Sequence, residues 1–254
     1  MYGAIYGDLA GSIYEYDQFK KVFGINPDTL VTKESFYSDD TILTIAVLEA
    51  LLNDFDYDQY LRMYIKKYQD YLPAYKPYFD TVFSPNMMKW ARGNEMGQST
   101  GNGAMMRISP VGFMCNSLQD VIYHARLATI PSHNSEEAIE AAKKIALVIF
   151  YLRNGYSKEE IFTRLNIKPK YQPFSKFNLT CSETINNCLY ALYVSTSFED
   201  AIRTTLLMGG DTDTNCCIVG SMAESLYGLT DDIIDTVDSH IPKEFIKVLR
   251  RAYE

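Results

Sequence analysis

The apolar residues of this chain recur with helical spacing along most of its length, and this periodicity constrains the fold more than any other feature. In Thr41–Leu52 the apolar positions cover most of the helix circumference, which is typical of a buried helix. Residues Asn134–Leu152 place alanine, isoleucine and leucine three and four residues apart, and Asn154-Gly155 follows as a stop signal. The two-residue alternation of strands is hard to find. We therefore predict an all-α fold.

Helix start and stop signals support the same fold class. Three sites have the spacing of a capping box, in which a Ser or Thr precedes an acid by three residues. These are Ser157 with Glu160, Thr180 with Glu183, and Ser197 with Asp200. Residues Thr214–Tyr227 are predicted to form a helix that ends at Gly228, and Pro242 suits the first turn of a last helix running through Ala252.

The segment Tyr71–Pro85 interrupts the helical pattern with Pro73, Pro77 and Pro85 among aromatic residues. It reads as an irregular excursion, because it lacks the flexible polar composition of a domain linker. The chain also has no repeat and no low-complexity tract. A length of 254 residues is enough to bury a substantial core. We expect one domain over residues 1–254.

Composition limits the partners and the compartment. The formal net charge is −8, so nucleic acid is not expected as a general partner. No apolar stretch is long enough for a membrane span, and the N-terminal region lacks a basic segment followed by an apolar one. We expect a soluble, cytoplasmic protein. The five cysteines include no CxxC pair, which favours small core residues over disulfides or a zinc site.

Two acidic segments, Ser38–Thr41 and Gly209–Thr214, each run directly into an apolar helical stretch. One interpretation is that both are helix N-caps, since Asp and Ser accept hydrogen bonds from free backbone N–H groups. However, four carboxylates in a half-buried place repel one another and lose hydration unless a divalent cation neutralises them. Oxygen ligands suit magnesium, manganese or calcium rather than zinc. The two segments together predict a split site for hard metal ions.

The N-terminal segment has glycines at positions 3, 7 and 11 within an apolar stretch. Glycine weakens a helix, so we expect these residues to permit close backbone contact. Glu15 follows at helical distance from Asp8 and Gly11, and could point the same way as Asp8 or Ser12. The alternative for Glu15 is a solvated surface acid.

A glycine-containing turn, Ser99–Arg107, also breaks the helical pattern. Gly101 and Gly103 can adopt unusual backbone angles and leave room, so that successive N–H groups could converge on an anion such as a diphosphate. The segment is neither a P-loop nor a dinucleotide fingerprint, and a plain turn is the alternative. His133 could stack on a base or donate to a phosphate, or it could be a capping or surface residue.

Five ordered motifs spread over nearly the whole chain resemble the ADP-ribosylglycohydrolase family, which includes the dinitrogenase reductase-activating glycohydrolases and the ADP-ribosyl-acceptor hydrolases. The motifs are Gly3–Glu15, Ser38–Thr41, Gly101–Phe113, Ser132–Asn134 and Gly209–Gly228. The resemblance implies a single-domain orthogonal helical bundle that carries two Mg²⁺ ions, with Mn²⁺ as a substitute. It also implies hydrolysis of the N- or O-glycosidic bond between ADP-ribose and an acceptor.

The resemblance assigns roles to individual positions. The implied metal ligands are Ser38, Asp39, Asp40, Asp211, Asp213 and Thr214, with Ser38 in place of the family's usual threonine. The implied substrate-binding residues are Ser99, Gly101, Asn102 and Gly103 at the diphosphate and His133 near the adenosine. Glu15 matches a mobile catalytic or metal-gating glutamate, and Thr212 is a spacer. Asn215-Cys216-Cys217 departs from the small or aliphatic residues usual there.

The implied chemistry suits these ligands. Two divalent ions can orient ribose hydroxyls, stabilise an oxocarbenium-like transition state and lower the pKa of a bound water that attacks C1 of the distal ribose. Glu15, Asp39 or Asp40 would transfer the proton, and the sequence leaves that choice open. The substrate would be an ADP-ribosylated protein or a small molecule containing ADP-ribose. The acceptor and the oligomeric state are also left open.

Three other kinds of protein could carry separated acidic segments. An all-α isoprenoid synthase would need a further acid one turn after Asp39-Asp40, where Leu43 and Thr44 stand. A calcium loop beginning at Asp211 would need glycine where Cys216 stands. A catalytically silent relative that only binds ADP-ribose or serves structurally is the remaining alternative, although all six implied ligands are present.

Overall fold

The computed structural model describes residues 1–73 and 80–253, which form helices joined by loops. In chain order the helices are α1 (Tyr2–Ser12), α2 (Glu15–Gln18), α3 (Asp39–Leu52), α4 (Tyr57–Tyr68), α5 (Pro85–Arg92), α6 (Gly103–Met106), α7 (Ser109–Met114), α8 (Leu118–Thr129), α9 (Glu136–Arg153), α10 (Lys158–Arg164), α11 (Cys181–Val194), α12 (Phe198–Met208), α13 (Thr212–Tyr227), α14 (Asp231–His240) and α15 (Lys243–Tyr253). The described residues contain no strand, only two isolated bridges. The all-α prediction is confirmed. Of the predicted excursion Tyr71–Pro85, Pro77 and its neighbours in 74–79 lie outside the described residues.

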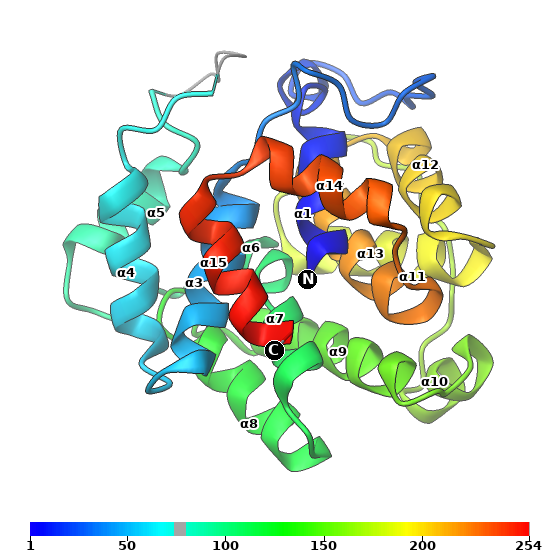
Figure 1. The fold of residues 1–254 in the computed structure, drawn as a ribbon. Helices are drawn as coiled ribbons and strands as arrows, with labels where there is room; N and C mark the ends of the chain where they lie inside the picture. Colours follow the sequence, from blue (N-terminus) through cyan, green and yellow to red (C-terminus); the bar gives the residue numbers. More distant parts are fainter. Residues whose placement is uncertain (74–79, 254) are drawn as a thin grey trace.

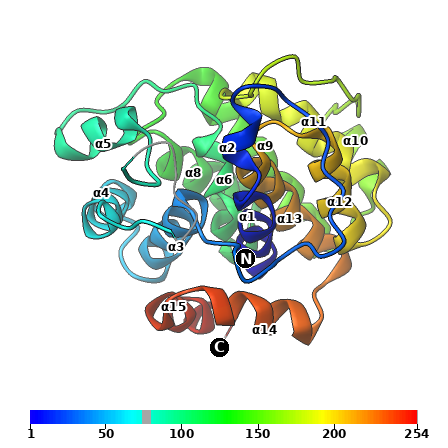
Figure 2. The same cartoon turned by 90° about the horizontal axis from the view of Figure 1, so that it is seen from above.

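Helices α1 and α13 lie side by side near the middle of the molecule (Figure 1, Figure 2). Helices α3, α4 and α5 lie on one side of this pair, and α11 and α12 lie on the other. Helix α9 contacts α13, α8 and α7, while α14 and α15 cover α1 and α3. The central pair is therefore surrounded by other helices and is protected from solvent along most of its length.

Glycines bring the α1 and α13 backbones unusually close. A Cβ added at Gly7 would lie 2.0 Å from the carbonyl oxygen of Cys216, and one added at Gly3 would lie 2.4 Å from the carbonyl oxygen of Gly220. At Gly11 an added Cβ would lie 2.3 Å from the carbonyl oxygen of Thr212. Such distances leave no room for any side chain. The predicted role of these glycines in close backbone contact is confirmed.

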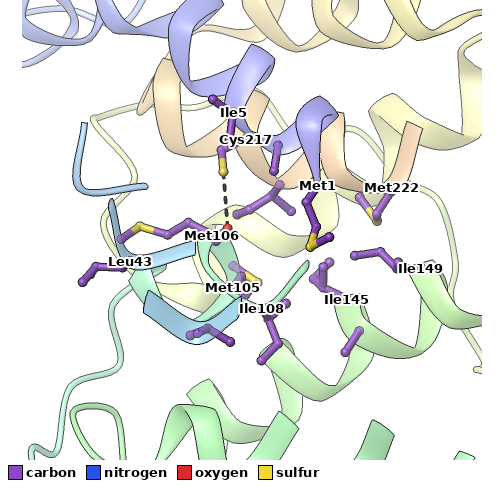
Figure 3. Packing of buried hydrophobic residues seen from close by; sticks show 14 of the residues in the cluster. Met1, Ile5, Leu43, Met105, Met106, Ile108, Ile145, Ile149, Cys217 and Met222 are labelled. Atoms are coloured by element: carbon purple, nitrogen blue, oxygen red, sulfur yellow. Dashed lines mark hydrogen bonds between the residues drawn. The ribbon is translucent and has the colours of Figure 1, made fainter. Parts of the chain in front are cut away.

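The core is one continuous cluster of apolar side chains that joins the central pair to the surrounding helices. Figure 3 shows a part of this cluster, in which Met1, the residue before α1, lies near Ile145 and Ile149 of α9. The thiol of Cys217 donates a hydrogen bond of 3.3 Å to the carbonyl oxygen of Met106 (Figure 3). All five cysteines are buried and free, as predicted for small core residues.

The predicted caps are mostly found. Ser157 and Thr180 form complete capping boxes at α10 and α11. Ser197 caps α12, but the carboxylate of its partner Asp200 accepts from the backbone of Thr196 rather than of Ser197. Helix α9 begins two residues later than predicted, because the backbone N–H of Asn134 donates to the carbonyl oxygen of Gly97 and holds that residue in a loop.

The described helices give no candidate for a membrane span, since none combines the necessary length and apolar character.

Candidate functional site

Acidic residues from four helices meet at one end of the α1–α13 contact. Carboxylate oxygens of Asp8, Asp40 and Asp213 lie within 4.8 Å of one another. Oxygens of Glu15, Asp211 and Asp213 form a second group within the same distance. The two acidic segments predicted to form a split site are therefore brought together, and Asp213 is shared by both groups.

The first acidic segment is placed by a helix start. Ser38 is the N-cap of α3, where its Oγ accepts from the backbone N–H of Asp40 at 3.1 Å. The same hydroxyl donates to Asp40 Oδ2 at 3.2 Å. Because the positive end of the α3 dipole lies here, it favours the Asp39 and Asp40 carboxylates. The N-cap interpretation and the convergence of the acids are both correct for this segment.

The second segment turns sharply before α13. Gly209 and Gly210 have φ values of 69° and 84°, which residues other than glycine rarely adopt. A Cβ on Gly209 would also lie 2.3 Å from the carbonyl oxygen of Phe23. The backbone N–H of Asp211 then donates to Asn178 Oδ1 at 2.9 Å. This turn directs Asp211 and Asp213 toward the acids of α1 and α3.

Asp8 is a member of the site to which the sequence analysis gave no role. Its Oδ2 accepts from the backbone N–H groups of Ser38 and Thr41 and from the Thr41 hydroxyl, at 2.9, 3.1 and 2.5 Å. Asp8 therefore fixes the start of α3 against α1. Its other oxygen, Oδ1, is buried without a partner among the described residues, and so is Oδ1 of Asp40. The sequence did contain a signal for Asp8, because it is an acid inside an apolar, glycine-rich helix. A charged residue is almost never buried without a partner, so such an acid is expected to have one.

Burial is the main cause of the shifted pKa values in this cluster. It raises the pKa of Asp213 and Asp40 well above the usual range, and the neighbouring carboxylates add to the shift. Burial, together with Asp213, raises the pKa of Asp8 to about 7, and burial raises that of Asp211 to about 6. Burial also raises the pKa of Glu15. The site favours either protons or cations over free carboxylates.

The other residues of the two acidic segments lie around the carboxylate groups rather than within them. The Thr214 hydroxyl donates to Asp40 Oδ2 at 3.2 Å, as the Ser38 hydroxyl does. Asp39 is half-buried and lies in neither carboxylate group, although burial and then Asp213 raise its pKa. The Thr212 hydroxyl donates to the carbonyl oxygen of Gly11, at the close contact between α1 and α13. Asn215 accepts from Asn178 Nδ2 at 2.9 Å and so supports the turn before α13.

The Gly101–Gly103 loop lies beside the second acidic group. Asn102 Nδ2 donates to Asp211 Oδ2 at 2.6 Å, which joins the two features directly. However, the N–H of Gly101 donates to Ser99 Oγ and the N–H of Asn102 donates to the carbonyl oxygen of Leu179. Neither Gly101 nor Gly103 has a positive φ. The expectation of unusual angles with successive converging N–H groups is wrong, because two of the three N–H groups already have acceptors.

His133 is buried, with 3 % of its surface exposed, and it does not cap α9, whose N-cap is Ser135. The capping and surface alternatives for His133 are therefore wrong. A Cβ added at Gly101 or Gly103 would lie 3.4 or 3.5 Å from His133 Nε2, so this edge of the ring faces the loop. Burial, with a smaller effect of Arg107, lowers the pKa of His133 well below its usual value. Burial therefore favours the neutral form of the imidazole.

A polar cavity of about 250 Å³ opens near the second acidic segment. Its walls include Phe174, whose ring would lie 3.1 Å from a Cβ added at Gly210, and Asn178, which holds the Asp211 backbone. The sequence analysis did not single out this region.

The family model described as ADP-ribosylglycohydrolase matches residues 1–253. The chain belongs to the ADP-ribosylglycohydrolase family. The resemblance of the five motifs is therefore confirmed.

Relatives within this family differ in length. An ADP-ribosylarginine hydrolase, Tri1, of Pseudomonas putida is 23 % identical over 259 residues, covering 90 % of this chain and 69 % of that protein. The ADP-ribosylhydrolase ARH3 of Homo sapiens is 27 % identical over 185 residues, covering 64 % of this chain and 51 % of that protein. The chain thus spans about half the length of ARH3.

A solved structure described as an ADP-ribosylglycohydrolase-related protein complex has the same fold. It gives a TM-score of 0.62 at 21 % identity and covers 97 % of this chain and 92 % of the other. The expected fold of the ADP-ribosylglycohydrolase type is confirmed.

Proposed function

We propose that this protein is a magnesium-dependent hydrolase that cleaves the glycosidic bond between ADP-ribose and an acceptor. Membership of the ADP-ribosylglycohydrolase family supports the reaction class, as do the names of the relatives Tri1 and ARH3. The observation that carries the proposal is the pair of carboxylate groups that share Asp213. Such an arrangement suits two adjacent divalent ions with one common ligand.

The donor set fits magnesium or manganese. All the grouped ligand atoms are carboxylate oxygens, which hard cations prefer. Asp8 Oδ1 and Asp40 Oδ1 are buried acceptors without a partner among the described residues, so a cation there would satisfy both. Asp8, Asp40 and Asp213 would hold one ion, and Glu15, Asp211 and Asp213 would hold the other. Ser38 and Thr214, whose hydroxyls donate to Asp40, remain candidate ligands or supports of that carboxylate.

Divalent ions in these positions would orient the ribose hydroxyls, offset charge in the transition state and lower the pKa of a bound water. The chain's own acids must then accept and return a proton. Asp40 is buried and accepts from two hydroxyls, whereas Glu15 and Asp39 are half-buried. Proton transfer is therefore proposed for Glu15 or Asp39, which are partly exposed.

The rest of the substrate would extend from the acids toward the loop. Asn102 contacts Asp211, and the Gly101–Gly103 loop leads from there to the ring of His133. Ser99 holds the loop by accepting from the Gly101 N–H, so its proposed part in diphosphate binding is indirect. The substrate is an ADP-ribosylated protein or a small molecule containing ADP-ribose.

The test is release of free ADP-ribose from a panel of linkages that includes ADP-ribosyl-arginine, ADP-ribosyl-serine and O-acetyl-ADP-ribose. We expect turnover of at least one linkage with Mg²⁺, none with EDTA, and recovery when Mg²⁺ or Mn²⁺ is restored. Glu15→Gln should slow turnover strongly. Asp17→Asn is its matched control, because Asp17 is an exposed acid on the same helix.

Undiminished turnover in EDTA would contradict the metal dependence. A protein that binds ADP-ribose tightly but releases it from no linkage would support the alternative, a catalytically silent ADP-ribose-binding relative.

A further inference from the structure

Arg107 is a buried cation without an ion-pair partner among the described residues. Its side chain has 0 % of its surface exposed, and burial lowers its pKa to about 10, so the guanidinium is still charged at neutral pH. Nε and Nη1 have no hydrogen-bond partner among the described residues. Burial of an unpaired charge is costly, so a fold that retains one has a specific use for it. Asp39 of the acidic cluster attracts the guanidinium electrostatically, but no ion pair or hydrogen bond joins the two among the described residues.

The one strong contact of Arg107 leads to His133 through Ser132. Arg107 Nη2 donates to Ser132 Oγ at 2.7 Å and more weakly to the carbonyl oxygen of Ala128 at 3.4 Å. Ser132 Oγ in turn lies 2.7 Å from His133 Nδ1. All three side chains are buried. They form a short chain of hydrogen bonds that runs from a fixed cation to an imidazole.

The direction of each hydrogen bond in this chain is determined by chemistry. A guanidinium can only donate, so Ser132 Oγ accepts from Arg107. The serine proton must then find its own acceptor, and His133 Nδ1 is the acceptor that the described residues provide. A proton on Nδ1 would leave the buried serine proton without a partner, which is unfavourable. The neutral imidazole therefore carries its proton on Nε2.

His133 Nε2 is the ring atom that faces the loop. It lies 3.4 and 3.5 Å from the positions of added Cβ atoms at Gly101 and Gly103. Two of the three consecutive N–H groups in this loop already donate to protein acceptors. The loop backbone alone is therefore a poor anion site, and a side-chain donor would supply what it lacks.

We propose that Arg107 and Ser132 are positioning residues that fix His133 as a donor through Nε2, directed at the Gly101–Gly103 loop, where it binds an oxygen of a diphosphate. The identity of that diphosphate as part of ADP-ribose rests on the proposed function. The charge of Arg107, which is linked to the ring through Ser132, adds an attraction for an anion. Arg107 does not itself touch the ligand.

The arrangement of the ring can be measured without any ligand. The chain has three histidines, and ¹⁵N-detected imidazole spectra distinguish a proton on Nε2 from one on Nδ1. His133→Gln assigns the His133 signals by their disappearance. We expect the wild type to show His133 with its proton on Nε2, and Ser132→Ala to show a mixture of both forms. Arg107→Met should give a similar mixture, whereas Arg107→Lys, which keeps a cation and a donor, should largely restore the wild-type form.

Binding of ADP-ribose is then measured by calorimetry in the presence of Mg²⁺. Ser132→Ala should raise the Kd roughly tenfold, the effect of weakening one hydrogen bond to a charged group. Ser109→Ala is the matched control, because Ser109 is equally buried but its hydroxyl has no partner among the described residues. It should leave both the ring spectrum and the Kd unchanged. Thermal melts show whether each variant is folded.

The possible outcomes separate this inference from the proposed function. A wild-type His133 with its proton on Nδ1 would overturn the inference, and so would a folded Ser132→Ala with unchanged spectrum and affinity. A wild type that shows the Nε2 form, binds ADP-ribose more weakly on Ser132→Ala substitution and yet hydrolyses no linkage would defeat the proposed reaction while supporting the inference.

Discussion

Helices α1 and α13 meet in two ways along one interface. In the middle, Gly3, Gly7 and Gly220 let the backbones touch with no space for a side chain. At one end the same helices contribute Asp8 and Asp213 to a cluster of acids whose pKa values are all raised by burial. The first contact is fully packed and satisfied, and the second contains buried oxygens without partners among the described residues.

The difference between these two parts separates a contact that stabilises the fold from the proposed metal site. Close packing in the middle determines how the helices are placed and leaves little freedom to shift them. The acidic end is unfavourable for the protein alone, because like charges are held together out of water. Its geometry is maintained by the packing next to it, as expected for a binding site on a rigid scaffold. Substitutions in the two parts should therefore change stability in opposite directions.

The largest effect is expected from Gly7→Ala. The added Cβ would lie 2.0 Å from a backbone oxygen of α13, which cannot move aside cheaply, so we expect a loss of about 3 kcal/mol or more in the free energy of unfolding. Gly93→Ala is the control, because its Cβ would meet its nearest neighbour at 3.6 Å. Urea unfolding followed by circular dichroism measures both. Equal stability of the two variants would show that the helices can separate at the glycines.

A second prediction concerns Asp213→Asn, which removes the charge shared by the two carboxylate groups. Hydrolysis should fall by at least about 100-fold, since even residues that only support metal ligands cost 10–100-fold when changed. In EDTA the same variant should be more stable than the wild type, because it relieves repulsion among buried acids. ADP-ribose release and urea unfolding measure the two effects.

Asp235→Asn, an exposed acid on α14, should change neither quantity measurably. An Asp213→Asn protein with near-normal turnover would remove Asp213 from the proposed metal site. A marked loss of stability in EDTA would show that the charge is stabilising rather than strained.

The smallest effect is the dependence of the free energy of unfolding on pH in the metal-free protein. The pKa values of Asp8 and Asp211 are raised to about 7 and about 6, so the native state holds these protons more tightly than the unfolded chain does. The stabilisation of the native state by these two protons is fully present below about pH 4. It is lost as the pH rises through the native pKa values of the two carboxyl groups. Between about pH 6 and 7 in EDTA, we expect the free energy of unfolding to fall by roughly 1 kcal/mol. Urea unfolding at several pH values tests this, and saturating Mg²⁺ should flatten the curve.

Much of the fold was predictable because its signals are local. The capping boxes at Ser157 and Thr180 need only residues within one turn, and both were found where the sequence placed them. The glycines of α1 were also interpretable, since glycine weakens an apolar helix unless a neighbouring backbone needs the space. Helices α4 and α8 were not predicted, although Ser117 and Asp120 provide the same cap spacing at the start of α8.

The site was predictable only where its residues lie in motifs. Asp40, Asp211 and Asp213 belong to acidic segments, and the structure gathers them. Asp8 could not be paired with Ser38 and Thr41 from sequence, because their contact joins residues about thirty positions apart. The link from Arg107 through Ser132 to His133 likewise depends on how α8 ends beside the loop. Tertiary contacts of this kind leave no periodic trace in the sequence.

The glycine contact between α1 and α13 also limits how such a protein can change over evolutionary time. Any substitution that tilts or rotates α1 must first displace a backbone, so the acids at its end are nearly invariant in position. The loops that border them have no regular structure, although Phe23 and Phe174 hold them against Gly209 and Gly210 of the turn before α13. Under the proposed function, acceptor preference would therefore change through the parts of residues 19–37 and 166–179 that lie away from these contacts, while the acids keep their places.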